Sequence, residues 1–188
     1  MNEIVDRVKR ILLNPKEALE EVKGEEINVQ DFMKQYVAVV AAIPAVAMFV
    51  GFLGLRANFM RSLLFCVLFY VVNLIGVFVF GKIIDALAPT FNATKDDLNA
   101  FKLSVYAFTP YFVAGIANIN PGLGFLSILG GLYGIYVLYL GTASLMSAPQ
   151  EKTVPYTAVA LIINAVVFVV LYMIAVAVTG MSPTRLLG

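Results

Sequence analysis

The chain has 188 residues, of which 61% are hydrophobic and only 13% are charged. Soluble domains are typically about 45–50% apolar and about 25% charged, so this chain has too little polar surface to cover a water-soluble body. Its 13 basic and 12 acidic residues nearly cancel, which argues against a nucleic-acid partner. The composition therefore predicts an integral membrane protein.

Charge is concentrated in residues 1–35, which we expect to form a cytosolic or interfacial segment of amphipathic helices. Apolar Ile4, Val8 and Ile11 recur there at helical spacing. Such a helix lies on the membrane surface, docks against the cytoplasmic face of the bundle or binds a partner, and the sequence leaves these alternatives open. The charged residues of this segment are Arg7, Lys9, Arg10, Lys16, Lys23, Lys34, Glu3, Asp6, Glu17, Glu20, Glu21, Glu25, Glu26 and Asp31.

Capping patterns predict where several helices begin. Asn14 before Pro15 is typical of an N-cap followed by a first-turn proline. Asn28 predicts a second cap, which leads into the first membrane span. Farther along, Thr94 with Asp97 predicts a capping box for a helix that continues into the third span.

Five apolar stretches follow, each near the roughly 20 residues that a helix needs to cross a bilayer. They cover about 36–55, 62–81, 103–119, 122–146 and 156–179. Backbone groups inside a bilayer must be paired within the segment, so these stretches are expected to be helices. The predicted fold is an all-α integral membrane protein, with a transmembrane domain over 36–179 and a short exterior tail over 180–188.

The connections between spans predict the orientation, because basic residues favour the cytoplasmic side. With the N-terminus inside, the inner side holds ten of the thirteen bases and all twelve acids, counting Lys82, Lys95 and Lys102 in the second connection. The expected topology is N-terminus cytoplasmic and C-terminus outside. Lys82 and Asp85, three residues apart, are expected to pair on one helix face.

Polar residues inside spans are the usual candidates for function, and in the expected spans they are neutral. They either make hydrogen bonds between helices or line a path for a solute. The candidates are Asn73, Tyr106, Thr109, Tyr133, Tyr136 and Asn164.

Small residues recur along the fourth span at intervals of three, four and seven. This spacing allows close approach of two helices, within one chain or between two copies, and we expect the first. The helix-packing candidates are Ser127, Gly130, Gly131, Gly134 and Gly141, and the candidate hinges are Pro44 and Pro110.

The sequence offers no group of residues that predicts catalysis. Histidine is absent, which removes the usual base and metal ligand, and the single cysteine, Cys66, lies in an apolar run. We therefore predict no catalytic residue, no cofactor and no metal site.

Three segments give the chain a family resemblance. They are Leu12-Leu13-Asn14-Pro15-Lys16-Glu17-Ala18 ahead of the spans, Ser104-Val105-Tyr106-Ala107-Phe108-Thr109-Pro110 in the third span, and Leu138-Tyr139-Leu140-Gly141 at the end of the fourth. In order and content they resemble the Yip family of five-span, Rab/Ypt-interacting membrane proteins, in its prokaryotic branch. The resemblance covers about residues 11–179. It implies a membrane adaptor, and the eukaryotic relatives act with GTPases in vesicle traffic.

Two functional hypotheses follow. The first is a non-enzymatic organiser of membrane partners or lipids, which sits in the lipid bilayer and binds another membrane or peripheral protein or a second copy of itself. The alternative is a small transporter or channel whose path is lined by the neutral polar residues, formed by one chain or by an oligomer.

Overall fold

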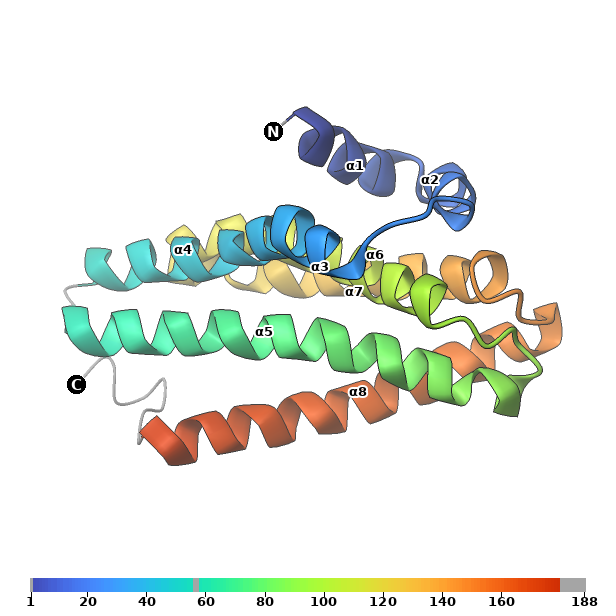
Figure 1. Cartoon of the computed structure of the whole chain (residues 1–188). Helices are drawn as coiled ribbons and strands as arrows, with labels where there is room; N and C mark the ends of the chain where they lie inside the picture. Colours follow the sequence, from blue (N-terminus) through green and yellow to red (C-terminus); the bar gives the residue numbers. More distant parts are fainter. Residues whose placement is uncertain (1, 56–57, 180–188) are drawn as a thin grey trace.

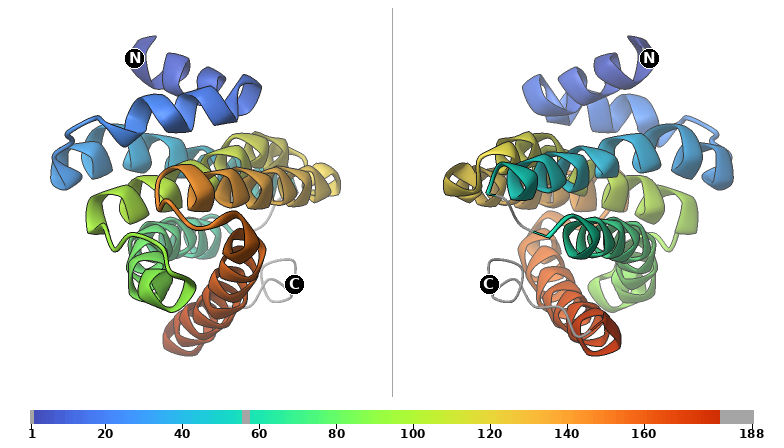
Figure 2. Two further views of the ribbon diagram at one scale, coloured as in Figure 1. Left: turned by 90° about the vertical axis from the view of Figure 1, so that its right-hand side faces the viewer. Right: turned by 90° about the vertical axis from the view of Figure 1, so that its left-hand side faces the viewer.

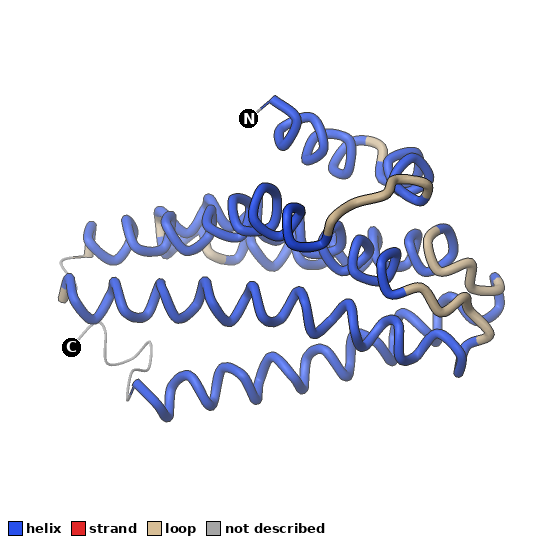
Figure 3. The backbone as a smooth tube through the Cα atoms, viewed as in Figure 1, coloured by secondary structure: helices blue, strands red, loops and turns tan. Residues whose placement is uncertain are grey.

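The computed structural model describes residues 2–55 and 58–179, and these are almost entirely helical, with no strand among them (Figure 3). Five helical segments are long and apolar enough to cross a membrane, which confirms the predicted fold class. They are Val29–Gly54, Phe59–Phe91, Asp97–Ile119, Phe125–Ser144 and Gln150–Ile174. The tail predicted for 180–188 lies outside the described residues, and the membrane boundaries stay predictions.

The helices form three layers (Figures 1 and 2). The helices α1 and α2 cover one side, α4, α6 and α7 make the middle layer, and α5 and α8 make the opposite side. The bounds are α1 (Asn2–Leu13), α2 (Pro15–Lys23), α3 (Val29–Phe32), α4 (Ala38–Gly54), α5 (Phe59–Leu87), α6 (Asp97–Ala114), α7 (Phe125–Ser144) and α8 (Gln150–Thr179). A π-helical turn, Met33–Val37, joins α3 to α4 without a break in the chain direction.

The N-cap of α3 is confirmed and that of α6 is not where the sequence indicated. The side chain of Asn28 accepts hydrogen bonds from the backbone N–H groups of Gln30 and Asp31. In α6 the cap is Asp96 instead of Thr94, because the Asp96 carboxylate accepts from the N–H of Asn99. The backbone N–H of Thr94 donates instead to Met146, which ties this connection to the end of α7.

The start of α2 is as predicted, although its cap is incomplete. Asn14 occupies the N-cap position and Pro15 the first turn, but the Asn14 side chain makes no capping hydrogen bond. The helix ends where Gly24 caps it. A proline at the first helical position needs no N–H partner, so this start is stable without the side-chain bond.

The core is centred on α6. In the most apolar stretch of each span, 67% of the residues are buried for Asp97–Ile119 and 11% for Gln150–Ile174. Helix α6 contacts α4, α5 and α7, and also α1 and α2, whereas α8 packs mainly on α5 and α7. Most residues in the membrane-spanning part of α6 are therefore packed against protein, including the polar side chains of Lys102, Ser104, Tyr106 and Thr109.

Helices α6 and α7 approach closely where α7 lacks side chains. A Cβ on Gly130 would lie 2.5 Å from the carbonyl oxygen of Pro110, and one on Gly134 would overlap the carbonyl oxygen of Ala107. Gly141 faces Leu103 in the same way. Gly131 lies off this contact, since an added Cβ there would have no described neighbour within 4 Å.

A matched pair of substitutions tests this contact. Gly134→Ala should lower the free energy of unfolding by about 1–3 kcal/mol, because the new methyl group must push α6 away or distort its backbone. Gly131→Ala adds the same methyl group three residues earlier on α7, where it points into open space. It should leave the free energy of unfolding unchanged or raise it. Unfolding of the two variants in mixed micelles of mild and denaturing detergent measures the difference. Equal stability would contradict this account of the α6–α7 contact.

Candidate functional site

A stripe of polar residues runs along one face of α6. Asn99, Lys102, Tyr106 and Thr109 are spaced by three, four and three residues, which places them on the same side of the helix. The Lys102, Tyr106 and Thr109 side chains are almost completely buried. We call these four residues the polar stripe. Each of them has a hydrogen-bond partner, and most of those partners come from residues 7–36.

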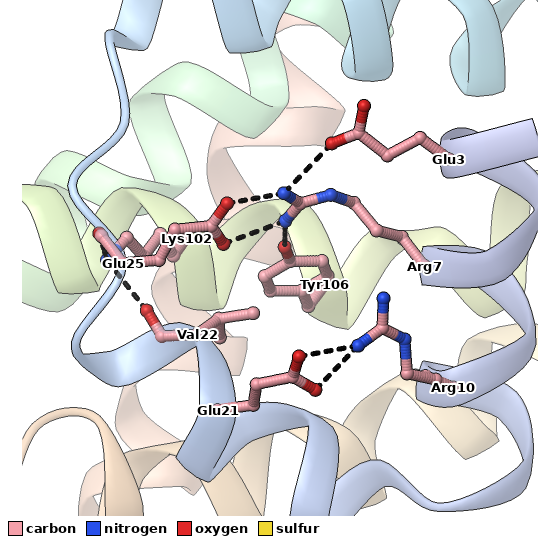
Figure 4. A network of polar contacts seen from close by, with 8 residues as sticks. All are labelled: Glu3, Arg7, Arg10, Glu21, Val22, Glu25, Lys102 and Tyr106. Atoms are coloured by element: carbon pink, nitrogen blue, oxygen red, sulfur yellow. Dashed lines mark hydrogen bonds and ion pairs between the residues drawn. The ribbon is translucent and has the colours of Figure 1, made fainter. Parts of the chain in front are cut away.

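The centre of the stripe is covered by an ion pair between the N-terminal helix and the loop after α2. The guanidinium of Arg7 donates from both terminal nitrogens to the carboxylate of Glu25, and the Nη1–Oε2 distance is 2.8 Å. Arg7 Nη1 also donates to the hydroxyl of Tyr106 at 3.0 Å. Figure 4 shows the guanidinium between these two groups, with the carboxylate of Glu3 on its outer side. Such bidentate pairing fixes both distance and orientation.

The side chain of Lys102 anchors the loop after α2 through hydrogen bonds to its backbone. Its side chain is only 1% exposed, and its ammonium donates to the backbone carbonyls of Val22, at 2.8 Å, and of Glu25. It also donates to the side-chain oxygen of Asn99. The sequence puts Lys102 in the second connection, on a helix expected to continue into the third span, and does not predict that its side chain is buried. The residue lies inside α6, where the carbonyls of Val22, in the last turn of α2, and of Glu25, in the loop after it, accept hydrogen bonds from its ammonium.

Aromatic side chains pack around the Thr109 end of the polar stripe. The hydroxyls of Tyr36 and Thr109 lie 3.1 Å apart and share a hydrogen bond. Phe32 stacks on Tyr36 with ring centroids 5.1 Å apart, and its ring lies 5.7 Å from the Arg7 guanidinium carbon. The positive charge of Arg7 is thus held by a carboxylate and by an aromatic face together.

Helices α1 and α2 also bind α7. The hydroxyl of Tyr133 donates to the carbonyl of Leu12 at 2.9 Å, and Lys23 donates to Ser147 in the connection after α7. Apolar packing supports these bonds, because Ile11 and Leu19 are among the most buried side chains of the protein. We call α1 and α2 together the N-terminal cap. It docks along the side of the bundle (Figure 2), which agrees with the expected docking of this segment, and its position relative to the membrane surface stays a prediction.

Two polar cavities flank Arg7. One, of about 220 Å³, lies between α1, α2 and α6 and is lined by Arg10, Glu21 and Tyr106 among others. The other, of about 320 Å³, lies between α1 and the start of the first span. Arg10 pairs with both carboxylate oxygens of Glu21 at 2.6 and 2.7 Å, so the basic groups facing the first cavity are neutralised within the cap.

The ion pair changes the titration of Glu25. Its hydrogen bond to Arg7 holds the pKa of the carboxyl below its ordinary value of 4.5, and partial burial opposes this only in part. The same hydrogen bond raises the pKa of Arg7 above its ordinary value. Both groups are therefore charged at neutral pH, and of the two only Glu25 loses its charge in acid.

The six polar residues singled out from the sequence lie in separate surroundings. Tyr106 and Thr109 belong to the polar stripe, and Tyr133 holds Leu12, while its neighbour Tyr136 is exposed on α7. Asn73 is buried in α5, and its amide nitrogen donates to the carbonyl of Phe69 within the same helix. Asn164 lines a cavity between α7 and α8, a different one from the cavity at Tyr106.

The two prolines proposed as hinges lie inside continuous helices. Pro44 in α4 is packed so that a Cβ on Gly115 would collide with its ring, and the carbonyl of Pro110 faces Gly130. Ser127 donates to the side chain of Asn118 in the turn before α7. These residues make contacts between helices, and whether the prolines bend during function stays a prediction.

The expected pairing of Lys82 with Asp85 is wrong. Lys82 donates to both carboxylate oxygens of Asp97, at 2.6 and 2.8 Å, across the α5–α6 connection. Asp85 points into the bundle, is buried, and has one oxygen without a hydrogen-bond partner among the described residues. Residues three apart lie on roughly the same helix face. Here, however, Lys82 is exposed and Asp85 is buried in the bundle, so the two side chains have different surroundings.

Sequence reasoning found Tyr106 and Thr109 but missed Lys102 beside them in the polar stripe, and it missed Arg7 and Glu25 as the partners of Tyr106 and Lys102. The signal available was the spacing of the polar stripe, which is typical of one helix face. Assigning Lys102 to a connection concealed that pattern. The partners themselves lie 77 to 99 residues away in sequence, and local spacing gives no information about them.

Comparison with known proteins supports the family resemblance. A family model described as the Yip1 domain matches residues 9–178, a range that includes all five of the long apolar helical segments and most of the N-terminal cap. The inner membrane protein YohC, from two strains of Escherichia coli, is 26% identical to this chain in an alignment of length 180. The alignment covers 89% of this chain and 92% of the relative. No solved structure matches the chain.

Docking of the N-terminal cap should depend on pH in a defined direction. A carboxyl whose pKa is lowered by folding contributes stability above its unfolded value of 4.5, and this contribution is lost as the pH falls through the lower, folded value. We expect hydrogen exchange of α1 to accelerate below about pH 4 and to be independent of pH, after correction for intrinsic exchange, near neutrality. In Glu25→Gln, exchange should already be faster at neutral pH and should lose this acid transition. A transition that persists in Glu25→Gln would assign it to another group.

Lys102→Met should release the end of α2 while leaving the spans folded. The substitution keeps the length of the side chain but removes the donor, so the carbonyls of Val22 and Glu25 lose a partner at a cost of about 1–3 kcal/mol. Hydrogen exchange over α2 should rise, with little change in α7. Lys95→Met is the matched control, because Lys95 is exposed on the neighbouring connection. Equal protection of α2 in both variants would contradict the anchoring role of Lys102.

Proposed function

The chain belongs to the Yip1 domain family, and on that premise we propose that it is a non-enzymatic organiser of other membrane components. The observation that carries the proposal is the N-terminal cap. A polar network of Arg7, Glu25 and Lys102 holds it in one place, and its outer surface is left available. A segment that served only to span the membrane would need neither feature.

The outer surface of the cap has the composition of a binding surface. Leu13 is 74% exposed and Val5 is also exposed, and exposed charged residues occur in the same helices. Interfaces of transient complexes combine apolar contacts with a polar rim. The exposed charged residues of the cap include Asp6, Lys9, Lys16, Glu17 and Glu20.

We further propose that the cap faces the cytoplasm in a prokaryotic cell membrane, with the C-terminus outside. The distribution of basic residues supports this orientation. The relative YohC is described as an inner membrane protein, which agrees with that location. The partner is then a cytoplasmic or membrane protein that meets the cap at the level of the lipid headgroups, or a second copy of the chain.

The alternative of a transporter or channel has less support. A path for a solute needs polar groups that face a common space. The six candidate residues instead make separate contacts, and Tyr106 and Asn164 line different cavities. Their arrangement favours a structural role in joining helices.

Site-specific crosslinking tests the adaptor proposal. A photoreactive side chain in place of Leu13 should give a discrete protein adduct in living cells, and the same probe in place of Ile162, on the apolar face of α8, should not. Reversing charges in Lys16→Glu with Glu20→Lys should abolish the adduct without lowering thermal stability, because both side chains are exposed. Deleting residues 1–27 should abolish partner recovery as well. Recovery that survives both changes would overturn the proposal.

A further inference from the structure

A groove at membrane depth runs between α7 and the helices that face it. It consists of two cavities, of about 660 and 420 Å³, that share Tyr111, Gly131 and Ile135 as lining residues. The first reaches the turn before α7 at Asn118, and the second reaches α8 at Asn164. The two together therefore form one elongated space inside the membrane-spanning part of the protein.

The groove exists because α7 has no side chain at Gly131. A Cβ there would have no described neighbour within 4 Å, whereas Gly130 and Gly134 on the same helix are packed tightly against α6. The two sets of glycines thus have different roles. Gly130 and Gly134 join α7 to α6, and Gly131, about 100° around the helix axis from Gly130, leaves the adjoining side of α7 open, where Gly134 also borders the second cavity.

The surroundings of the groove indicate what fills it. Ile128 and Leu132 line it and are 65% and 58% exposed, so its wall continues directly into the surface that faces lipid. Water is excluded from the hydrocarbon region, and an empty space would lose the dispersion contacts that apolar groups otherwise make. The medium next to the opening is lipid, whose chains are as apolar as the lining.

One polar group in the groove is left unsatisfied. The side-chain oxygen of Asn164 is buried and has no hydrogen-bond partner among the described residues. Within a bilayer such a group costs free energy unless a ligand pairs with it. A lipid offers polar ester or hydroxyl groups beside its chains, and an amide can rotate to donate or to accept.

We propose that this groove binds a single membrane lipid, whose acyl chain lies along α7 over Gly131 and whose polar group pairs with Asn164. The site is separate from the N-terminal cap. A test of lipid binding in this groove can therefore succeed or fail without affecting the adaptor proposal.

Fluorescence quenching tests the proposal in the complete chain. The protein contains no tryptophan, so Phe69→Trp on the groove wall and Ile162→Trp on the outer face of α8 each supply a single reporter. Each variant is reconstituted into vesicles of phosphatidylethanolamine and phosphatidylglycerol with brominated acyl chains. Both reporters should be quenched relative to vesicles without bromine.

Filling the groove then separates a bound chain from general contact with the bilayer. Adding Gly131→Leu should remove most of the quenching of Phe69→Trp and leave that of Ile162→Trp unchanged. Gly54→Leu is the matched control, because Gly54 is also an open helical glycine and lines neither cavity. It should leave both reporters as they were, and equal thermal stability of the two leucine variants shows that both are folded.

Two results would overturn the proposal. Emission of Phe69→Trp that bromine does not quench would mean that protein fills the groove, either a second copy or residues 180–188 of the same chain. Quenching of Phe69→Trp that Gly131→Leu leaves intact would mean that the reporter meets bulk lipid outside the groove. Crosslinking between copies at Leu132 distinguishes the two protein occupants in the first case.

Discussion

The polar stripe on α6 sets the main constraint on this structure. A lysine, a tyrosine and a threonine occupy one face of a helix that crosses the bilayer, and none of them is tolerated against lipid without a partner. The protein meets this constraint with its own N-terminus. Arg7, Glu25 and the end of α2 supply the charges and carbonyls that the stripe requires, and Tyr36 completes its outer end.

Helix α6 is joined to α7 by a different kind of contact. Against α7 the contact consists of backbone and small residues, and against the N-terminal cap it consists of long polar side chains. The first kind of contact depends on shape alone and tolerates no added volume. The second depends on charge and can be weakened by protonation without changing the spans. A rigid bundle and a separable cap are therefore built on two faces of one helix.

Most of the fold could be predicted from the sequence, because length, apolar content and capping are local properties. Five spans and the start at Asn28 are examples. The cap of α6 was missed: the sequence pattern indicated Thr94, but Asp96 caps the helix, and Thr94 bonds instead to Met146 in a distant connection. For the same reason, only part of the candidate site could be predicted from the sequence. Tyr106 marked it, but its partners are brought together by the packing of the cap, which the pattern of one segment does not encode.

The bond from Tyr133 to Leu12 has a consequence for biosynthesis. Its two residues are 121 positions apart, and the helix that carries Tyr133 is made after three other spans. At about 5–20 residues per second, a ribosome needs about 6–24 s to extend the chain over this separation of 121 residues. Helix α1 is thus made well before the helix that fixes its final position. During that interval the charged helices of the cap are available to the insertion machinery and to chaperones, and the cap can close only after the fourth span has been made.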